Sequence, residues 1–415
     1  MPSTRPQDES VLDRLWTLRR ARALSRTDSA RAERQLVLLS AGTALRRTEM
    51  DSRAKRLTTE VDWARLTATL RQRRLLPILG PRICELAEHR ASEGFTAAVE
   101  QAVEAGRRQG TLLQLVCLRV ISALAEAEIP SVALKGPLLA EAIYGDVGRR
   151  LSSDIDVLVA PEQLYAAVDV VRELGYAAPA DYVEDSGLPM VHFALAPEHA
   201  GLPPVELHWR THWYDRNFAR ERLLPPTMPP VDSWRPAPVD EFVSLLLFYA
   251  RDGFVDLRLA IDVGAWWDAF GGEIQAGAVD ELLRTYPTLA RAIVVAVKVT
   301  EMTVGLPTAR ILKEPPKLNV RDRMAIRLAN PNPHTRRSQL YADMGLIDGL
   351  LAPPGGFGAF ARRQILLPQE VFDERAQQIE GWRSKSRFGH SARILTRFGF
   401  AMTRLLRTPE VLERG

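Results

Sequence analysis

One short stretch of alternating residue types restricts the possible folds of this chain more than any other feature. In Asp154-Ile-Asp-Val-Leu-Val159, acidic and apolar residues alternate over the first four positions, which predicts a β-strand. Asp154 and Asp156 then share one face, while Ile155, Val157 and Val159 share the other and face a core. Helical periodicity dominates both before and after this region. We therefore expect an α+β protein in which a small mixed sheet with packed helices is embedded in a mostly helical chain.

Turn residues and prolines delimit the elements around this strand. Pro137 suits the first residue of a helix, and Gly145 and Gly175 suit helix ends. The turn-rich stretch PEHAGLPP predicts a hairpin between the last two strands. The order is strand, helix, strand, helix, strand, strand, over residues 129–134, 137–145, 154–159, 161–175, 190–196 and 205–210.

The chain divides into four expected regions. They are an N-terminal helical region (1–128), the α/β core (129–212), a helical domain that closes the cleft (213–310) and a C-terminal helical region with a basic tail (311–415). The proline-rich residues 225–238 predict a linker. The basic tail, residues 385–407, could touch a membrane surface, RNA or an acidic partner, but a helix docked on the body with its arginines in water is favoured.

Composition excludes several classes of protein. The 415 residues carry 55 Lys+Arg against 51 Asp+Glu, a formal net charge of +4, which gives no reason to expect a nucleic-acid partner. Two cysteines are too few for a disulfide framework. The N-terminal residues contain no apolar signal segment, and no apolar run is long enough to cross a bilayer. We expect a cytoplasmic protein without a membrane span.

Three carboxylates form the expected centre of the chemistry. Asp154 and Asp156 on one strand face repel each other unless a proton or a cation lies between them, and Mg²⁺ prefers such oxygen ligands. In Val205-Glu-Leu-His-Trp209, Glu206 and His208 share one face. If this strand lies beside the Asp-Ile-Asp strand, Glu206 completes a site in which two metal ions could activate an acceptor hydroxyl and stabilise a pyrophosphate leaving group.

The phosphate ligands are expected just before these carboxylates. Lys135 and Gly136 stand at a predicted helix N-terminus, where backbone N–H groups favour anions. Arg150, Ser152 and Ser153 could add charge and hydrogen bonds, and His208 could help to bind the nucleotide or the acceptor. Structural alternatives stay open: a solvated lysine, an arginine paired with Asp146 or Asp154, turn-forming serines and a buried structural histidine. His192 and His212 are too scattered in the sequence to predict a zinc site.

Three of these stretches together resemble a known family. LKGPLLAEAIYGD from Leu134, RLSSDIDVLV from Arg150 and VELHW from Val205 are similar to the uncharacterised bacterial nucleotidyltransferases of the polymerase-beta superfamily, often encoded beside lasso-peptide or exopolysaccharide genes. The resemblance implies a polymerase-beta-like core, Mg²⁺ (or Mn²⁺) and an NTP, with ATP the expected donor. It makes Asp154 and Asp156 metal ligands, and Glu206 a third ligand or the base.

The chain departs from this pattern at two places. Proline follows Gly136 where the superfamily usually has serine, and the Tyr249–Gly253 stretch lacks a histidine that relatives carry before the aspartate matched by Asp262. Asp262 could line the cleft or serve in a buried pair. We expect transfer of a nucleoside monophosphate to a small molecule, sugar or peptide. The alternatives are toxin-like nucleotidylation of a protein or tRNA, and a non-catalytic nucleotide-binding module.

Overall fold

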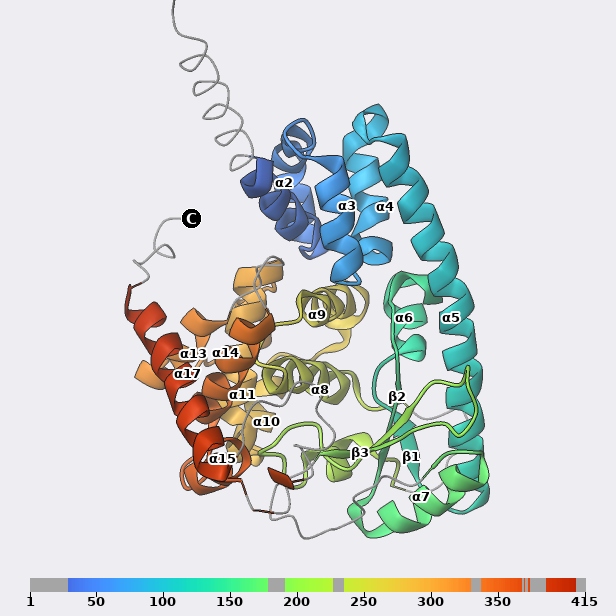
Figure 1. Cartoon of the computed structure of the whole chain (residues 1–415), viewed down its shortest axis with the longest axis vertical. Coiled ribbons are helices and arrows are strands. Elements are labelled where there is room, and N and C mark those ends of the chain that lie inside the picture. The colour runs from blue at the N-terminus through green and yellow to red at the C-terminus, as the bar shows by residue number, and fades with distance from the viewer. Residues whose placement is uncertain are drawn as a thin grey trace, which may run out of the picture.

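Helices surround a small sheet in this protein (Figure 1). The computed structural model describes residues 29–177, 191–226, 235–329, 337–367 and 386–407, together with positions 369, 372 and 373. The expected α+β class, a mostly helical chain with a small mixed sheet, is confirmed. Residues 1–28 and most of the expected linker lie outside the described residues, and the boundaries of the four expected regions stay predictions.

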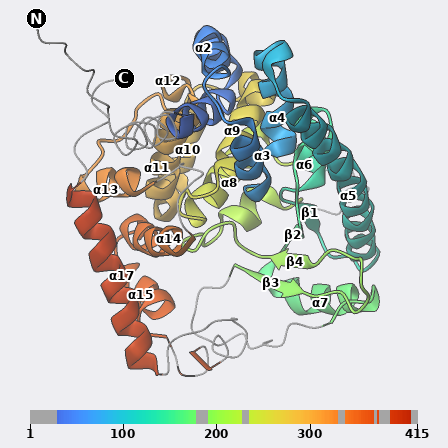
Figure 2. The same cartoon turned by 45° about the horizontal axis from the view of Figure 1, so that its top comes forward.

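The sheet has four strands in the order β1-β2-β4-β3 (Figure 2). The strands are β1 (Ser131–Ala133), β2 (Ile155–Val159), β3 (His192–Leu195) and β4 (Val205–His208). β2 and β4 run parallel, whereas β1 is antiparallel to β2 and β3 is antiparallel to β4. Each expected strand is present but shorter than its apolar pattern, and the expected hairpin is the antiparallel pair β3–β4.

The two faces of β2 meet different surroundings. Ile155, Val157 and Val159 join an apolar cluster with α5 (Glu93–Glu126) and α7 (Leu164–Glu173). Leu158 belongs to the cluster of the helical body on the opposite side. Because every residue of β2 is buried, Asp156 is a carboxylate inside the protein, and it needs partners there.

A close approach between α5 and a turn fixes the chain just before the acidic strand. The side chain of Ser92 caps α5, which runs along one edge of the molecule in both views (Figures 1 and 2). A Cβ at Gly106 would collide with the backbone of Gly148, in the 3-10 turn Val147–Arg149. The contact therefore depends on glycine, and it sets where the segment that leads to Asp154 begins.

The helix α8 (Pro238–Arg251) separates the acidic sheet face from the helical body. It packs on α9 (Leu257–Phe270) and α11 (Pro287–Val304), and nearly all of it is buried. It begins at Pro238, the last residue of the expected linker, because proline fits the first turn of a helix. Its Phe248 ring meets the His208 ring edge-on at 5.9 Å, so α8 is the wall opposite the carboxylates.

The remaining helices complete the body. They are α2 (Ala44–Leu57), α3 (Trp63–Gln72), α4 (Leu76–Ala87), α6 (Pro137–Tyr144), α10 (Ala278–Thr285), α12 (Thr308–Ile311), α13 (Val320–Leu328), α14 (Arg337–Leu351), α15 (Phe357–Gln364) and α17 (Arg387–Arg407). The basic tail helix α17 lies along α14, and its Phe398 ring stacks on Phe360 with centroids 6.2 Å apart. The tail is thus docked on the body, which is the favoured interpretation of its sequence.

Candidate active site

The parallel pairing of β2 and β4 brings two carboxylates together. Asp156 is the register partner of Glu206, so their side chains project from adjacent strands on the same face. Asp154 comes just before β2, two residues from Asp156. Glu206 and Asp156 each add negative charge to the surroundings of Asp154. The three acidic residues singled out in the sequence therefore converge in space.

Lys135 and His208 both contact the buried carboxylate of Asp156. The His208 Nε2 atom lies 2.9 Å from Asp156 Oδ1 and 3.2 Å from Glu206 Oε2. The Lys135 ammonium lies 2.9 Å from the same Asp156 oxygen. Burial opposes ionisation of Asp156, but Lys135 and His208 outweigh it and hold the pKa of this carboxyl well below its usual range.

The other two carboxylates respond differently to the same surroundings. Burial, followed by the charge of Asp156, raises the pKa of Asp154. Burial also opposes ionisation of Glu206, but the hydrogen bond with His208 lowers the pKa of this carboxyl. Asp154 is thus the least compensated member of the group, as expected where negative charge accumulates.

The group is partly exposed to solvent. The side chains of Asp156 and His208 are 1% and 0% exposed, whereas those of Lys135, Glu206 and His192 are 14%, 21% and 32% exposed. Gly136 adds open space, because a Cβ placed there would meet no atom within 4 Å. A ligand can therefore approach from the side of these more exposed residues.

The Gly136 backbone suits close contact with an anion. Its φ of 95° lies in a region that favours glycine, and Pro137 follows as the first residue of α6. The first N–H groups of a helix lack partners within the helix, and the helix dipole makes this end positive. Phosphate binding at Lys135 and Gly136 stays a prediction, with the backbone free to accommodate it.

The segment Arg150–Ser153 is held by the protein itself. Arg150 is buried, donates to Asp262 at 2.7 Å and also bonds the Ser152 hydroxyl. The backbone oxygens of Leu151 and Ser152 accept bonds from Arg258 at 2.5 Å and Gln109 at 2.8 Å, and Arg74 donates to the Ser153 hydroxyl at 3.3 Å. These contacts position the segment that leads into Asp154. A direct role of Arg150, Ser152 and Ser153 in nucleotide binding stays a prediction.

Comparison with protein families matches residues 59–302 to the uncharacterised nucleotidyltransferase family. The chain belongs to this family. It is a nucleotidyltransferase, and the match includes the three carboxylates, Lys135 and all four strands. No curated protein and no solved structure is similar enough to count as a match.

Sequence reasoning missed two residues of this nucleotidyltransferase that lie beside the carboxylates. His192 Nε2 is 3.7 Å from Glu206 Oε2, because β3 places His192 opposite His208. Arg251 of α8 lies over the Phe248 ring at 4.7 Å, and its side chain is only 10% exposed. Its buried Nη1 atom has no hydrogen-bond partner among the described residues. The register of β3 against β4 places His192 there, and the position of α8 places Arg251 there. Neither can be read from the sequence.

Asp262 has a buried partner rather than a place beside the carboxylates. Besides Arg150, it accepts a hydrogen bond of 2.7 Å from the Tyr144 hydroxyl. Asp262 and Arg150 lie 112 residues apart in the chain, so the pair joins α9 to the segment before the acidic strand. Of the two sequence interpretations, the structure shows the buried pair.

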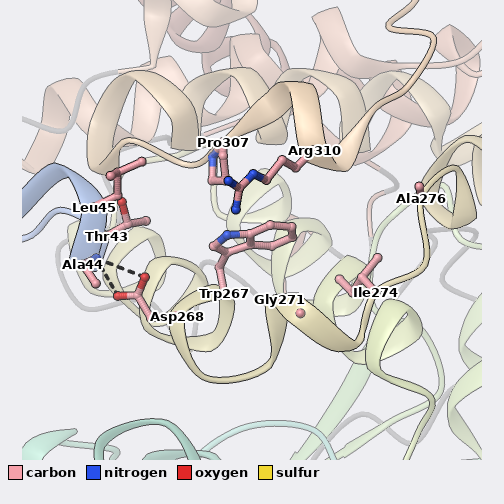
Figure 3. Close-up of a pocket in the computed structure, with 11 residues that line it drawn as sticks. Thr43, Ala44, Leu45, Trp267, Asp268, Gly271, Ile274, Ala276, Pro307 and Arg310 are labelled. Carbon is pink, nitrogen blue, oxygen red and sulfur yellow. Dashed lines mark hydrogen bonds between the residues drawn. The ribbon is translucent and has the colours of Figure 1, made fainter.

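A separate cavity of about 490 Å³ lies at the C-terminal end of α9 (Figure 3). Trp267 and Arg310 face each other across it, and Asp268 accepts bonds from the Ala44 N–H at its edge. None of the residues that line this cavity belongs to the carboxylate group. Within the described residues, no helix combines the length and apolar character needed to cross a membrane.

Proposed function

We propose that this nucleotidyltransferase moves a nucleoside monophosphate from an NTP, with ATP the expected donor, to a hydroxyl of a small molecule, sugar or peptide. Pyrophosphate is the second product. The proposal depends on one observation: Asp156 and Glu206 are register partners on parallel strands, with Asp154 just before the first. This arrangement of carboxylates on two neighbouring strands is consistent with a polymerase-beta-like core.

The donor set of the site fits a hard divalent cation. Asp154, Asp156 and Glu206 offer the oxygen ligands that Mg²⁺ or Mn²⁺ prefers. Part of the rise in the pKa of Asp154 comes from the charges of the other two carboxylates, and a cation between them would relieve that repulsion. The bound metal would neutralise phosphate charge and make the acceptor hydroxyl easier to deprotonate.

Lys135 has a second task in the proposed reaction. Without a metal it serves as the counter-ion of Asp156, at 2.9 Å. Once Asp156 has another cationic partner, the Lys135 ammonium is free to bind a phosphate oxygen beside the open backbone at Gly136. Arg251 provides further positive charge against the same Phe248 ring that Lys135 covers at 5.2 Å.

The bonds that form and break are those of phosphoryl substitution. The acceptor oxygen forms a bond to the α-phosphorus, and the bond from that phosphorus to the oxygen of the β-phosphate breaks. Pyrophosphate leaves with that electron pair. Lys135 and Arg251 can stabilise its negative charge. Glu206 reaches solvent at the open side, and the carboxylate oxygen of Glu206 that does not bind the metal accepts the proton of the hydroxyl.

The identity of the acceptor can be tested with labelled nucleotides. Each of the four NTPs, labelled at the α-phosphate, is incubated with the protein and a cell lysate, which is then separated into macromolecules and small extracts. We expect label in the small-molecule or peptide fraction, with ATP the best donor. Label in protein or RNA would instead establish the macromolecular acceptor. Label in neither fraction, from any of the four nucleotides, would contradict the proposed transfer.

Replacing Arg251 by Gln should raise the KM for the NTP by about 10- to 100-fold, because a hydrogen bond between charged groups contributes about 1.5–3 kcal/mol. Initial rates at varied NTP concentration measure this change. Arg108→Gln is the matched control, since its side chain is 70% exposed and pairs with Glu104 on the α5 surface. A KM for Arg251→Gln within twofold of the wild-type value would remove Arg251 from the phosphate site.

A further inference from the structure

Two histidines and a glutamate form a compact group at the open side of the carboxylate site. His192 is the cross-strand partner of His208, and Glu206 lies two residues before His208 on the same face of β4. One ligand atom from each residue can be chosen so that all three lie within 4.8 Å of one another. Neither histidine was expected to bind a metal, because their proximity depends on the register of β3 against β4.

The spacing of these atoms matches the ligands of one metal ion. Glu206 Oε2 lies 3.2 Å from His208 Nε2 and 3.7 Å from His192 Nε2. Two ligands bound to one zinc ion at about 2.1 Å in tetrahedral geometry are about 3.4 Å apart. Both distances are close to this value, and the ligand atoms of the two histidines lie within 4.8 Å of each other, so coordination would draw the side chains together around one ion.

The type of ligand decides which ion fits. Mg²⁺ is coordinated by oxygen, whereas imidazole nitrogen suits Zn²⁺, and two histidines with one glutamate form a common catalytic zinc set. His192 and Glu206 are partly exposed, so an ion can reach them from solvent.

We propose that His192, Glu206 and His208 bind Zn²⁺ at the open side of the active site, next to the position of Asp154 and Asp156. The inference deepens the proposed function, because Glu206 is common to both ligand sets and the ion would lie where the acceptor enters. Zinc binding itself needs neither nucleotide nor Mg²⁺, so it can be measured separately from transfer.

Zinc binding by the metal-stripped full-length chain tests this proposal. Zn²⁺ alone is titrated by calorimetry, and metal content is measured after equilibrium dialysis. We expect one Zn²⁺ per wild-type chain. His192→Asn should weaken binding by at least about 100-fold, because even the loss of a residue that only supports a ligand costs about 10- to 100-fold. The control His199→Asn removes an exposed histidine from the loop after β3 and should bind like the wild type.

Asp154→Asn separates this inference from the proposed function. It keeps all three zinc ligands, so it should bind Zn²⁺ normally even where transfer is lost. Equal zinc affinity in His192→Asn and wild type would overturn the proposed site, and so would a wild-type chain that takes up no stoichiometric zinc. Wild-type transfer by Asp154→Asn would instead contradict the proposed reaction and leave the zinc result unaffected.

Discussion

Asp154→Asn should lose at least about 10³-fold in nucleotidyl transfer, because losing this proposed metal ligand would forfeit several kcal/mol of transition-state stabilisation and about 4 kcal/mol corresponds to that factor. The same change should leave the thermal midpoint of unfolding unchanged or raise it. Burial and the charge of Asp156 raise the pKa of Asp154, so ionising this carboxyl is less favourable in the folded chain than in the unfolded chain. The neutral amide removes that repulsion.

Asp156→Asn provides the contrast. It should be equally inactive, but its midpoint should fall, because Lys135 loses its counter-ion and His208 loses a charged hydrogen-bond partner. We expect a loss of about 1–3 kcal/mol in the free energy of unfolding, since a buried group loses its charged partner. Initial rates with α-labelled NTP and thermal unfolding curves measure both properties.

Asp169→Asn on α7 serves as the control for both variants, because its side chain is 70% exposed. It should keep both wild-type activity and the wild-type midpoint. Wild-type turnover by Asp154→Asn or Asp156→Asn would refute the metal-binding role of the carboxylates. A clear fall in the midpoint of Asp154→Asn would show that this carboxylate stabilises the fold rather than strains it.

The strands and their buried faces could be predicted because their signal is local. Alternation in Asp154–Val159 and in Val205–Trp209 assigns each side chain to a face without knowledge of the rest of the chain. Pro137 and Gly145 delimit α6 in the same way, through their own backbone preferences. The sequence predicts that Glu206 joins the aspartates only if β4 lies beside β2, and the structure shows this pairing.

Contacts between distant segments could not be predicted. His192 joins the site only because the hairpin register places it opposite His208, and a shift by one residue would turn it to the other face. Arg251 gave no signal of its own, since an arginine near a helix end is ordinarily a surface residue. Arg150 was assigned two nearby aspartates as possible partners, but it binds Asp262 on a distant helix.

Lys135 can serve both as a phosphate ligand and as a structural counter-ion. Its sequence position at a helix N-terminus predicts a phosphate ligand, and the ion pair with Asp156 shows a structural counter-ion. These roles belong to successive states of the proposed reaction, because a cation on Asp156 makes the lysine charge redundant there. The stability of the free enzyme and the proposed binding of the substrate thus both depend on the Lys135 ammonium group.

The buried pair between Arg150 and Asp262 should be the most sensitive point of the fold. Their side chains are 3% and 0% exposed, with 2.7 Å between Nε and Oδ2. Asp262→Ala should lower the free energy of unfolding by about 3–5 kcal/mol, because it leaves the Arg150 charge buried without its partner. Urea unfolding followed by circular dichroism measures the loss, and the exposed Asp169→Asn again gives the baseline.

The double variant Arg150→Met with Asp262→Leu distinguishes an electrostatic cause from a loss of packing. Replacing both charges by apolar groups of similar size removes the unpaired ion, so much of the lost stability should return. Transfer should stay low, at least about tenfold below wild type, because Arg150 no longer fixes the segment before Asp154 and small displacements of a reacting group are costly. If the double variant were as unstable as Asp262→Ala, packing would be the cause. If it were stable and fully active, the pair would have no part in positioning Asp154.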